Sequence, residues 1–496
     1  MTEGSAPRRG SSPARRVIGA GLAGALLIAA GLGCRRSATE APQLTHGVAV
    51  GEVSPTGAVF WGRCASATRL HVHIDDVERE GAADATAAND FTAKIALGGL
   101  TAATRYDYRV WCGDATGYAE AGVFHTAPAP DTRTAVRFAW SGDLAGQNVC
   151  RDRARGYPIF EQLTDRGLAF FIGLGDMIYA DDECLPIGRY GNTQLPGPAP
   201  ATDLAAFWAH WQYNWSELGF QRLRAQLPYY GVWDDHEIRD DSGPHDDESP
   251  RAPGRHLLPI ALQAFLDYQP LIPPPDDPTR LYRSVRWGKQ VEVFLLDLRQ
   301  YRDALAAIDS DAHPKTMLGA AQLAWLEHAL ATSDATWKVI VASVPLSIPT
   351  GTKARDGFAD GGTGQGYERE AAHIFGALHA NRIRNSLWIT TDVHFATGFV
   401  YRPFADDPGW TTTEFTSGPL NAGVFPRPDL DPTFHPERLF LYGPPSADSI
   451  ASFTEAIGWF NFGMVDIDPD GNLTVSIVNG RGEIVYQHSM AAAPPD

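Results

Sequence analysis

Short apolar runs alternate with amphipathic stretches of helical length over residues 135–490. Runs such as 169–175 and 291–296 are too short for typical helices and lack the polar alternation of half-exposed strands, so they predict strands buried on both faces. Helices are predicted over 204–226, 257–268, 320–331 and 368–380. This alternation predicts a layered α/β domain. Later strands at 414–417, 461–466 and 473–478 predict a second sheet.

Residues 44–128 follow a different pattern, in which short strand-like runs are divided by turn residues. The predicted strands are 58–63, 69–74, 91–96, 105–111 and 122–126. Leu100 followed by Tyr106 resembles the tyrosine corner of fibronectin-type sandwiches. The spacing predicts a separate fibronectin-like or Ig-like β-sandwich, joined to the α/β domain by residues 128–132.

Five of the strand-like runs end on an aspartate. The residues that follow these runs are Asp143, Asp176, Asp234-Asp235-His236, Asp297 and Asp392-Val393-His394. One aspartate after a strand is usually a turn residue or a helix cap, but five such ends with two histidines are hard to explain by turn chemistry. Ligands bind at the carboxyl ends of strands in open α/β sheets. Carboxylates and imidazoles gathered there predict a two-metal hydrolytic site.

Length and charge narrow the function classes. A chain of 496 residues with 44% hydrophobic residues is long enough for two or three domains. The net charge of −18 argues against nucleic acid as a partner, because nonspecific binding to nucleic acid needs a basic surface. It does not argue against a small phosphate ester, because bound metal ions dominate the local field. A monomer is expected.

The first 34 residues have the features of an export signal. The pair Arg15-Arg16 precedes the apolar run 17–32, which is short for a transmembrane helix and is typical of a signal sequence. The pair resembles a twin-arginine signal, and the residues before Cys34 resemble a lipobox. We therefore expect a protein exported to the periplasm or the cell envelope, with a lipid on Cys34 as its only membrane attachment and residues 35–43 as a tether.

The other four cysteines fit an oxidising compartment. Cys64 and Cys112 end two predicted strands of the sandwich, and Cys150 and Cys184 both follow strands that end on a candidate ligand. Disulfides Cys64–Cys112 and Cys150–Cys184 are expected, although the spacing alone does not prove this pairing. A structural zinc site is disfavoured because the chain has no C-x-x-C pair.

Four ordered motifs resemble the PhoD-type alkaline phosphatase/phosphodiesterase family of the metallophosphoesterase superfamily. They are GDMIY at 175–179, WDDHE at 233–237, LDLRQYR at 296–302 and TDVH at 391–394. The resemblance implies a four-layer αββα metallophosphoesterase core over residues 135–490, preceded by the fibronectin-like domain. It also implies hydrolysis of phosphate monoesters or diesters, with a metal-activated hydroxide attacking phosphorus.

The resemblance implies a ligand set as well. Asp176 is expected to bridge two metals, with Asp143, Tyr179 and His394 on one ion and Asp235 and Asp392 on the other. The family implies Fe(III) bound by a tyrosinate beside Ca²⁺, with Zn²⁺ or Mn²⁺ as alternatives. The first strand of the best-known members ends in Ala-Ser-Cys, where the cysteine binds iron, but here Asp143 is a harder ligand. Asp240-Asp241 stand where the family has Asn-Asn, so the resemblance does not carry a further calcium contact over to these positions.

Two residues are expected to act on the substrate. His236 can protonate the leaving oxygen or hold a phosphoryl oxygen, and Arg299 can bind phosphate oxygens in a bidentate manner or form a salt bridge to Asp297. Asp181 and Asp182 are interpreted as rim charges. Two alternative functions stay open: a non-catalytic carbohydrate-binding or cell-wall-binding protein built on the sandwich, and a glycosidase. Neither explains the cluster of aspartate, histidine and Tyr179.

Overall fold

The computed structural model describes residues 43–114, 116–245, 254–426 and 429–493. The predicted export signal, Cys34 and the tether as far as residue 42 lie outside this described part of the chain. No helix among the described residues combines the length and the apolar composition needed to cross a membrane.

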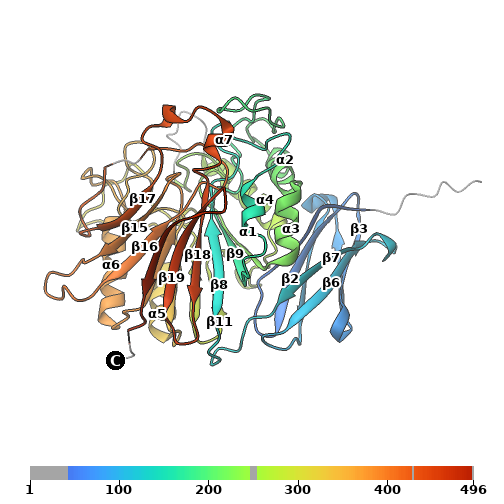
Figure 1. Ribbon diagram of the computed structural model, residues 1–496, viewed down its shortest axis with the longest axis horizontal. Coiled ribbons are helices and arrows are strands. Elements are labelled where there is room, and N and C mark those ends of the chain that lie inside the picture. The colour runs from blue at the N-terminus through green and yellow to red at the C-terminus, as the bar shows by residue number, and fades with distance from the viewer. Residues whose placement is uncertain (1–42, 115, 246–253, 427–428, 494–496) are drawn as a thin grey trace, which may run out of the picture. The chain divides into compact units, whose positions relative to one another are not determined.

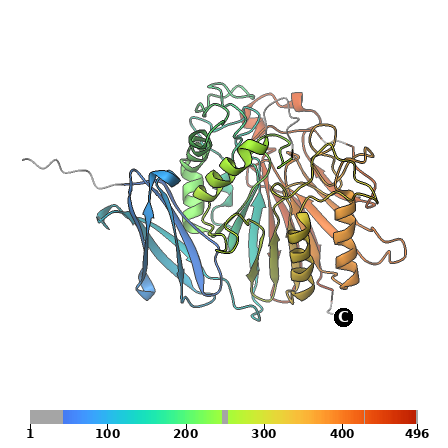
Figure 2. The same ribbon diagram turned by 180° about the vertical axis from the view of Figure 1, so that it is seen from behind.

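Two large β-sheets form the centre of the fold, and helices cover the outer face of each (Figures 1 and 2). The nine-stranded sheet has the order β20 (Ile484–Met490), β19 (Leu473–Asn479), β18 (Asn461–Ile467), β8 (Val136–Ser141), β9 (Phe170–Leu174), β10 (Tyr229–Val232), β1 (Leu44–Gly51), β2 (Gly57–Cys64) and β5 (Thr92–Gly98). The seven-stranded sheet has the order β11 (Arg283–Trp287), β12 (Val291–Leu295), β13 (Trp337–Val341), β14 (Ser386–Thr390), β16 (Thr412–Thr416), β15 (Ala396–Tyr401) and β17 (Glu437–Tyr442).

The side chains of single strands divide between an inner and an outer core. In β12, Val293 packs between the two sheets, whereas Phe294 packs on the outer side. In β9, Ile172 is part of the inner core and Phe171 of the outer one. The helices beside the nine-stranded sheet are α1 (Ile159–Leu163), α2 (Leu204–Trp215), α3 (Leu218–Gln226) and α4 (Gly254–Tyr268), and those beside the seven-stranded sheet are α5 (Gly319–Thr332) and α6 (Glu368–Ala380). This arrangement is the predicted four-layer αββα fold, and it explains why the strands are apolar on both faces.

The N-terminal strands form a β-sandwich that shares a sheet with the α/β core. Its second sheet has the order β4 (Arg79–Ala85), β3 (Thr68–Ile74), β6 (Arg105–Cys112) and β7 (Glu120–His125). Strand β1 pairs in parallel with β10 at Gly51 and Tyr229, so β1, β2 and β5 extend the nine-stranded sheet. The Tyr106 hydroxyl accepts a hydrogen bond from the Thr101 amide at 2.9 Å, as a tyrosine corner requires.

Two details of the sequence prediction are wrong. The single helix expected over 204–226 is two helices, α2 and α3, because the Glu217 side chain caps α3 by accepting from the Phe220 amide at 2.7 Å. The later strands do not form one second sheet. Strand β16 lies in the seven-stranded sheet, whereas β18 and β19 lie in the nine-stranded sheet beside β8. The pairing of β18 with β8 joins segments more than 300 residues apart, for example Val136 with Ile467, and no local pattern encodes it.

Both predicted disulfides, Cys64–Cys112 and Cys150–Cys184, are confirmed. The first links β2 of one sandwich sheet to β6 of the other. The second joins the loop after β8 to the loop after β9, so it fixes two loops that carry candidate ligands.

Replacing Cys150 and Cys184 together by serine should lower the free energy of unfolding. The bridge spans a sequence separation of 34 residues, and a loop of this size contributes about 3–4 kcal/mol by restricting the unfolded chain. Urea titration of the oxidised wild type and the double variant measures the difference. Equal midpoints would show that packing alone holds these loops.

Candidate active site

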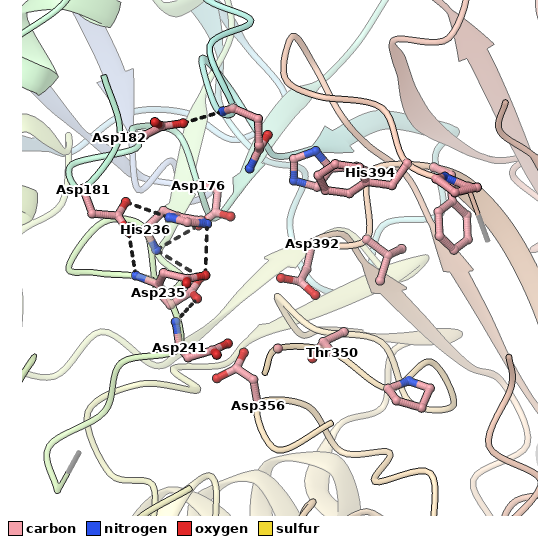
Figure 3. Close-up of a pocket in the computed structure, with 18 residues that line it drawn as sticks. Asp176, Asp181, Asp182, Asp235, His236, Asp241, Thr350, Asp356, Asp392 and His394 are labelled. Atoms are coloured by element: carbon pink, nitrogen blue, oxygen red, sulfur yellow. Dashed lines mark hydrogen bonds and ion pairs between the residues drawn. The ribbon is translucent and has the colours of Figure 1, made fainter. Parts of the chain in front are cut away.

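A cavity of about 600 Å³ opens where the strands of the two sheets end. Its walls carry eight aspartates and two histidines: Asp176, Asp181, Asp182, Asp235, Asp240, Asp241, Asp356, Asp392, His236 and His394. Figure 3 shows Asp392 and His394 on one side of this cavity and Asp235 and His236 on the other. The predicted convergence of strand ends therefore produces one acidic cavity.

Asp143, Tyr179 and His394 form one group of oxygen and nitrogen donors. The Tyr179 hydroxyl lies 3.0 Å from His394 Nε2, and Asp143 Oδ1 lies 3.6 Å from the same nitrogen. His394 Nδ1 donates to the carbonyl of Gly423, which leaves Nε2 as the acceptor that faces the other two side chains. Burial lowers the pKa of His394 to about 3. The imidazole is therefore neutral, which is the form that binds metals.

A second group contains Asp176, Asp234, Asp235 and Asp392, with one carboxylate oxygen of each within 4.8 Å of the others. Asp176 also lies within this distance of Asp235 and His236. One oxygen of Asp234 already has protein partners, because Oδ1 accepts hydrogen bonds from Arg299 Nε and from the Ser343 hydroxyl, both at 2.6 Å. Asp235, Asp240 and Asp241 form a further cluster of the same kind toward the rim.

Four of the candidate ligands have left-handed backbone conformations. Asp143, Asp176, Asp392 and His394 have φ angles of 61°, 51°, 77° and 60°. Such angles are unfavourable for residues other than glycine and concentrate at functional sites, where the surrounding structure holds them.

Glu237 supplies part of that support. Its buried carboxylate accepts hydrogen bonds from the amides of Asp176 at 2.9 Å, Met177 at 2.7 Å and Asp234 at 2.7 Å. One side chain thus joins the turn after β9 to the turn after β10.

The density of buried carboxylates fits bound cations. Burial and the charge of Asp234 raise the pKa of Asp143 to about 7, although a hydrogen bond from Thr391 opposes this shift. Burial likewise raises the pKa of Asp235 to about 8, although the Arg299 charge opposes this shift. Asp143 Oδ1 and Asp234 Oδ2 are buried without a hydrogen-bond partner among the described residues. Carboxylates in this situation need positive charge nearby, and metal ions provide it.

His236 is paired with Asp181 at the cavity wall. Its Nδ1 lies 2.7 Å from Asp181 Oδ1, and the Asp181 side chain is only 7% exposed. Burial lowers the pKa of His236, but the charges of Asp181, Asp235 and Asp176 outweigh burial and raise it well above the ordinary value. Asp181 is therefore a buried partner of His236, and its interpretation as a rim charge is wrong. Asp182 accepts from the Gln147 amide at 2.6 Å.

Arg299 is placed differently from the prediction. Its side chain is 0% exposed, and it forms a bidentate pair with Asp356 at 2.7 and 2.8 Å in addition to its bond with Asp234. It does not line the cavity. Because Asp234 and Asp356 occupy the guanidinium, this arrangement favours a supporting role for Arg299 over the expected contact with substrate phosphate. Asp297 contacts the Arg299 amide and the Trp233 indole at 3.0 and 2.9 Å, and not the Arg299 guanidinium.

Sequence reasoning missed the supporting roles of Glu237, Asp181 and Asp356. Glu237 lies in the motif WDDHE, and this position could have suggested that its carboxylate is buried. Asp356 lies in the glycine-rich segment 348–366 and is joined to Arg299 and Arg302 across more than 50 residues. No local pattern marks it.

Comparisons with known proteins agree with this geometry. The family described as PhoD-like phosphatase matches residues 138–472, and its N-terminal domain matches residues 29–128. Alkaline phosphatase D of Bacillus subtilis (strain 168) is 25% identical over 340 residues, which cover 65% of this chain. The match spans 56% of the Bacillus protein's own length.

Two solved structures share the fold. The structure of PhoD superposes with a TM-score of 0.72 at 19% identity, covering 91% of this chain and 90% of that one. The purple acid phosphatase PPD1 from yellow lupin (Lupinus luteus) seeds superposes with a TM-score of 0.59 at 12% identity, covering 91% and 74%. The layered fold, the cluster of carboxylates at its strand ends and the family match over residues 138–472 lead to one conclusion: this chain belongs to the PhoD-like phosphatase family.

Proposed function

We propose that the protein is an exported, metal-dependent hydrolase of phosphate monoesters, phosphate diesters or both. The observation that carries this proposal is the group of four carboxylates formed by Asp176, Asp234, Asp235 and Asp392, three of which line one open cavity together with His236 and His394. The family match supports the reaction class. The simplest test is hydrolysis of aryl phosphate esters by purified protein before and after removal of metals with a chelator. Full activity in the chelated, metal-free protein would contradict the proposal.

The residues divide between two cation positions. Asp143, Tyr179 and His394 would hold one cation, Asp235 and Asp392 the other, and Asp176 would contact both. Cations held in this way neutralise phosphoryl oxygens and acidify a water molecule. The protein itself contributes fixed oxygen donors, the neutral His394 imidazole and a rigid backbone at four ligand positions.

Tyr179 bears on the identity of the metals. Its phenol is buried, and burial together with the charges of Asp176 and Asp143 raises its pKa well above the ordinary value. A cation of high charge is needed to bind this oxygen as a phenolate, which favours Fe(III) at the Tyr179 position. The all-oxygen second position suits Ca²⁺. Zn²⁺ or Mn²⁺ at both positions is the alternative.

His236 is proposed as the general acid. Its link to Asp181 fixes the ring and favours the protonated form, so Nε2 can give a proton to the departing oxygen. Arg299 is proposed as a positioning residue that holds Asp234 and Asp356 rather than the substrate. Export is proposed from the N-terminal signal features, and the two disulfides support an oxidising compartment. The lipid on Cys34 is part of the same proposal.

Tyr179→Phe should remove visible colour from the iron-loaded protein. A tyrosinate bound to Fe(III) absorbs by charge transfer, and phenylalanine has no oxygen to bind the metal. Absorption spectra and metal analysis of the wild type and the variant test this expectation. A colourless wild type that is fully active with zinc or manganese would rule out iron and leave the two-cation site intact.

Asp143→Asn should weaken metal binding by roughly 10–100-fold, because a neutral amide is a poorer ligand for a hard cation. Asp143→Cys should keep part of the activity, because a thiolate can bind iron. Metal content and turnover of both variants, measured in parallel, check the assignment. Wild-type metal content and turnover in Asp143→Asn would reduce Asp143 to a turn residue.

His236→Ala should lower turnover by roughly 10²–10⁴-fold while both metals stay bound. The loss should be largest for alkyl esters, which need a proton on the leaving oxygen, and smaller for nitrophenyl esters. Asp181→Asn should show the same dependence on leaving group with a smaller loss. Equal losses for alkyl and nitrophenyl esters would point to phosphate binding by His236, and loss of a metal would make His236 a ligand.

A further inference from the structure

The candidate cavity has no lysine or arginine among its described lining residues. One arginine, Arg189, stands at its edge. Its guanidinium lies 5.9 Å from the centre of the Phe425 ring, and Phe425 lines the cavity. The same ring stacks with the His394 imidazole, at 4.6 Å between ring centres. Phe425 therefore contacts both the exposed Arg189 and the candidate ligand His394.

Arg189 also contacts the segment that orients His394. A Cβ atom on Gly423 would lie 3.4 Å from Arg189 Nη1, so the guanidinium passes close to this glycine. The Gly423 carbonyl accepts the bond from His394 Nδ1. The next residue in the chain after Arg189, Tyr190, accepts a hydrogen bond on its hydroxyl from the Val424 amide at 3.0 Å. The segment 423–425 and the turn that contains Arg189 and Tyr190 therefore hold each other in place.

The turn that carries Arg189 is held in place. The Arg189 amide donates to the Asn148 carbonyl at 2.8 Å, and the Asn148 side chain contacts Ile187 and Leu185 at 3.1 and 3.0 Å. The disulfide Cys150–Cys184 closes the same pair of loops. The Arg189 guanidinium therefore has a defined position at the cavity edge, which reduces the entropy that is lost when it binds an anion.

Arg189 is exposed, and no carboxylate among the described residues forms an ion pair with it. An arginine stacked on an aromatic ring keeps the N–H groups at the edge of its guanidinium plane for hydrogen bonds. These groups match the oxygens of a phosphate, phosphonate or carboxylate. The scissile phosphate belongs at the metal positions, so Arg189 is left for a second anionic group on the same substrate.

We propose that Arg189 is a specificity-determining residue that selects phosphate esters carrying a second anionic group, a phosphate in particular, away from the scissile phosphorus. The proposal rests on the proposed function. It predicts that the enzyme discriminates between substrates that share one leaving group and differ only in the charge of the part that faces Arg189.

The test compares two p-nitrophenyl phosphodiesters whose second ester group is either ethyl or 2-phosphonoethyl. Both release the same nitrophenolate, and the phosphonate carbon–phosphorus bond is not an ester and stays intact. Wild type should show the higher kcat/KM for the phosphonoethyl ester. Arg189→Gln should lose this preference by roughly tenfold, the effect of one charge-assisted hydrogen bond. Arg189→Lys should retain part of it, and added salt should weaken the wild-type preference.

Arg153→Gln is the matched control, because Arg153 is an exposed arginine that lines a different cavity on the same pair of loops. It should keep the wild-type ratio. If Arg189→Gln only damages His394, both kcat/KM values should fall together and their ratio should stay unchanged, and this result would overturn the proposal. An equal loss of the ratio in Arg153→Gln would overturn it as well. Absence of hydrolysis of both esters and of the monoester p-nitrophenyl phosphate by metal-loaded wild type would instead overturn the proposed function, and the Arg189 proposal with it.

Discussion

Mutual repulsion among buried carboxylates is the constraint on which the active-site region depends. Asp143, Asp176, Asp234, Asp235 and Asp392 gather where the strands end, and four of these five have raised pKa values because burial disfavours their charge. The guanidinium of Arg299 opposes this repulsion only at Asp234 and Asp235. The other three carboxylates have no arginine beside them in the described part of the chain, and their uncompensated negative charge makes the cavity suitable for cations.

The fold must hold these groups together against that repulsion. It does so with contacts between neighbouring strand ends and between layers. Glu237 binds the amides of two ligand turns, and Asn214 of α2 donates to the Met177 carbonyl at 2.7 Å from the outer helical layer. The left-handed residues in the turns are tolerated because such bonds determine the backbone on both sides of them.

The N-terminal sandwich contributes to the same support. Arg224 of α3 is completely buried, and one of its nitrogens donates both to the His46 carbonyl of β1 and to the Trp215 carbonyl of α2, at 3.0 and 2.9 Å. Its guanidinium lies 4.7 Å from the Trp215 ring centre and 5.6 Å from that of Trp61. The sandwich is therefore part of the structure that backs the ligand loops, since it packs on the helices that hold them.

The sequence by itself determined the strands, the layered fold, the sandwich and most of the candidate ligands. Buried strands have continuous apolar runs, and aspartates such as Asp176 and Asp392 follow them directly, so both features are local. The tertiary structure alone decided what the charged groups contact. Arg299 meets Asp356, Asp181 meets His236, and Arg189 meets Phe425, in each case at a sequence separation of 55 or more. The physical reason is that an ion pair or a stacking contact depends on distance in space, and chain topology sets that distance independently of the local pattern.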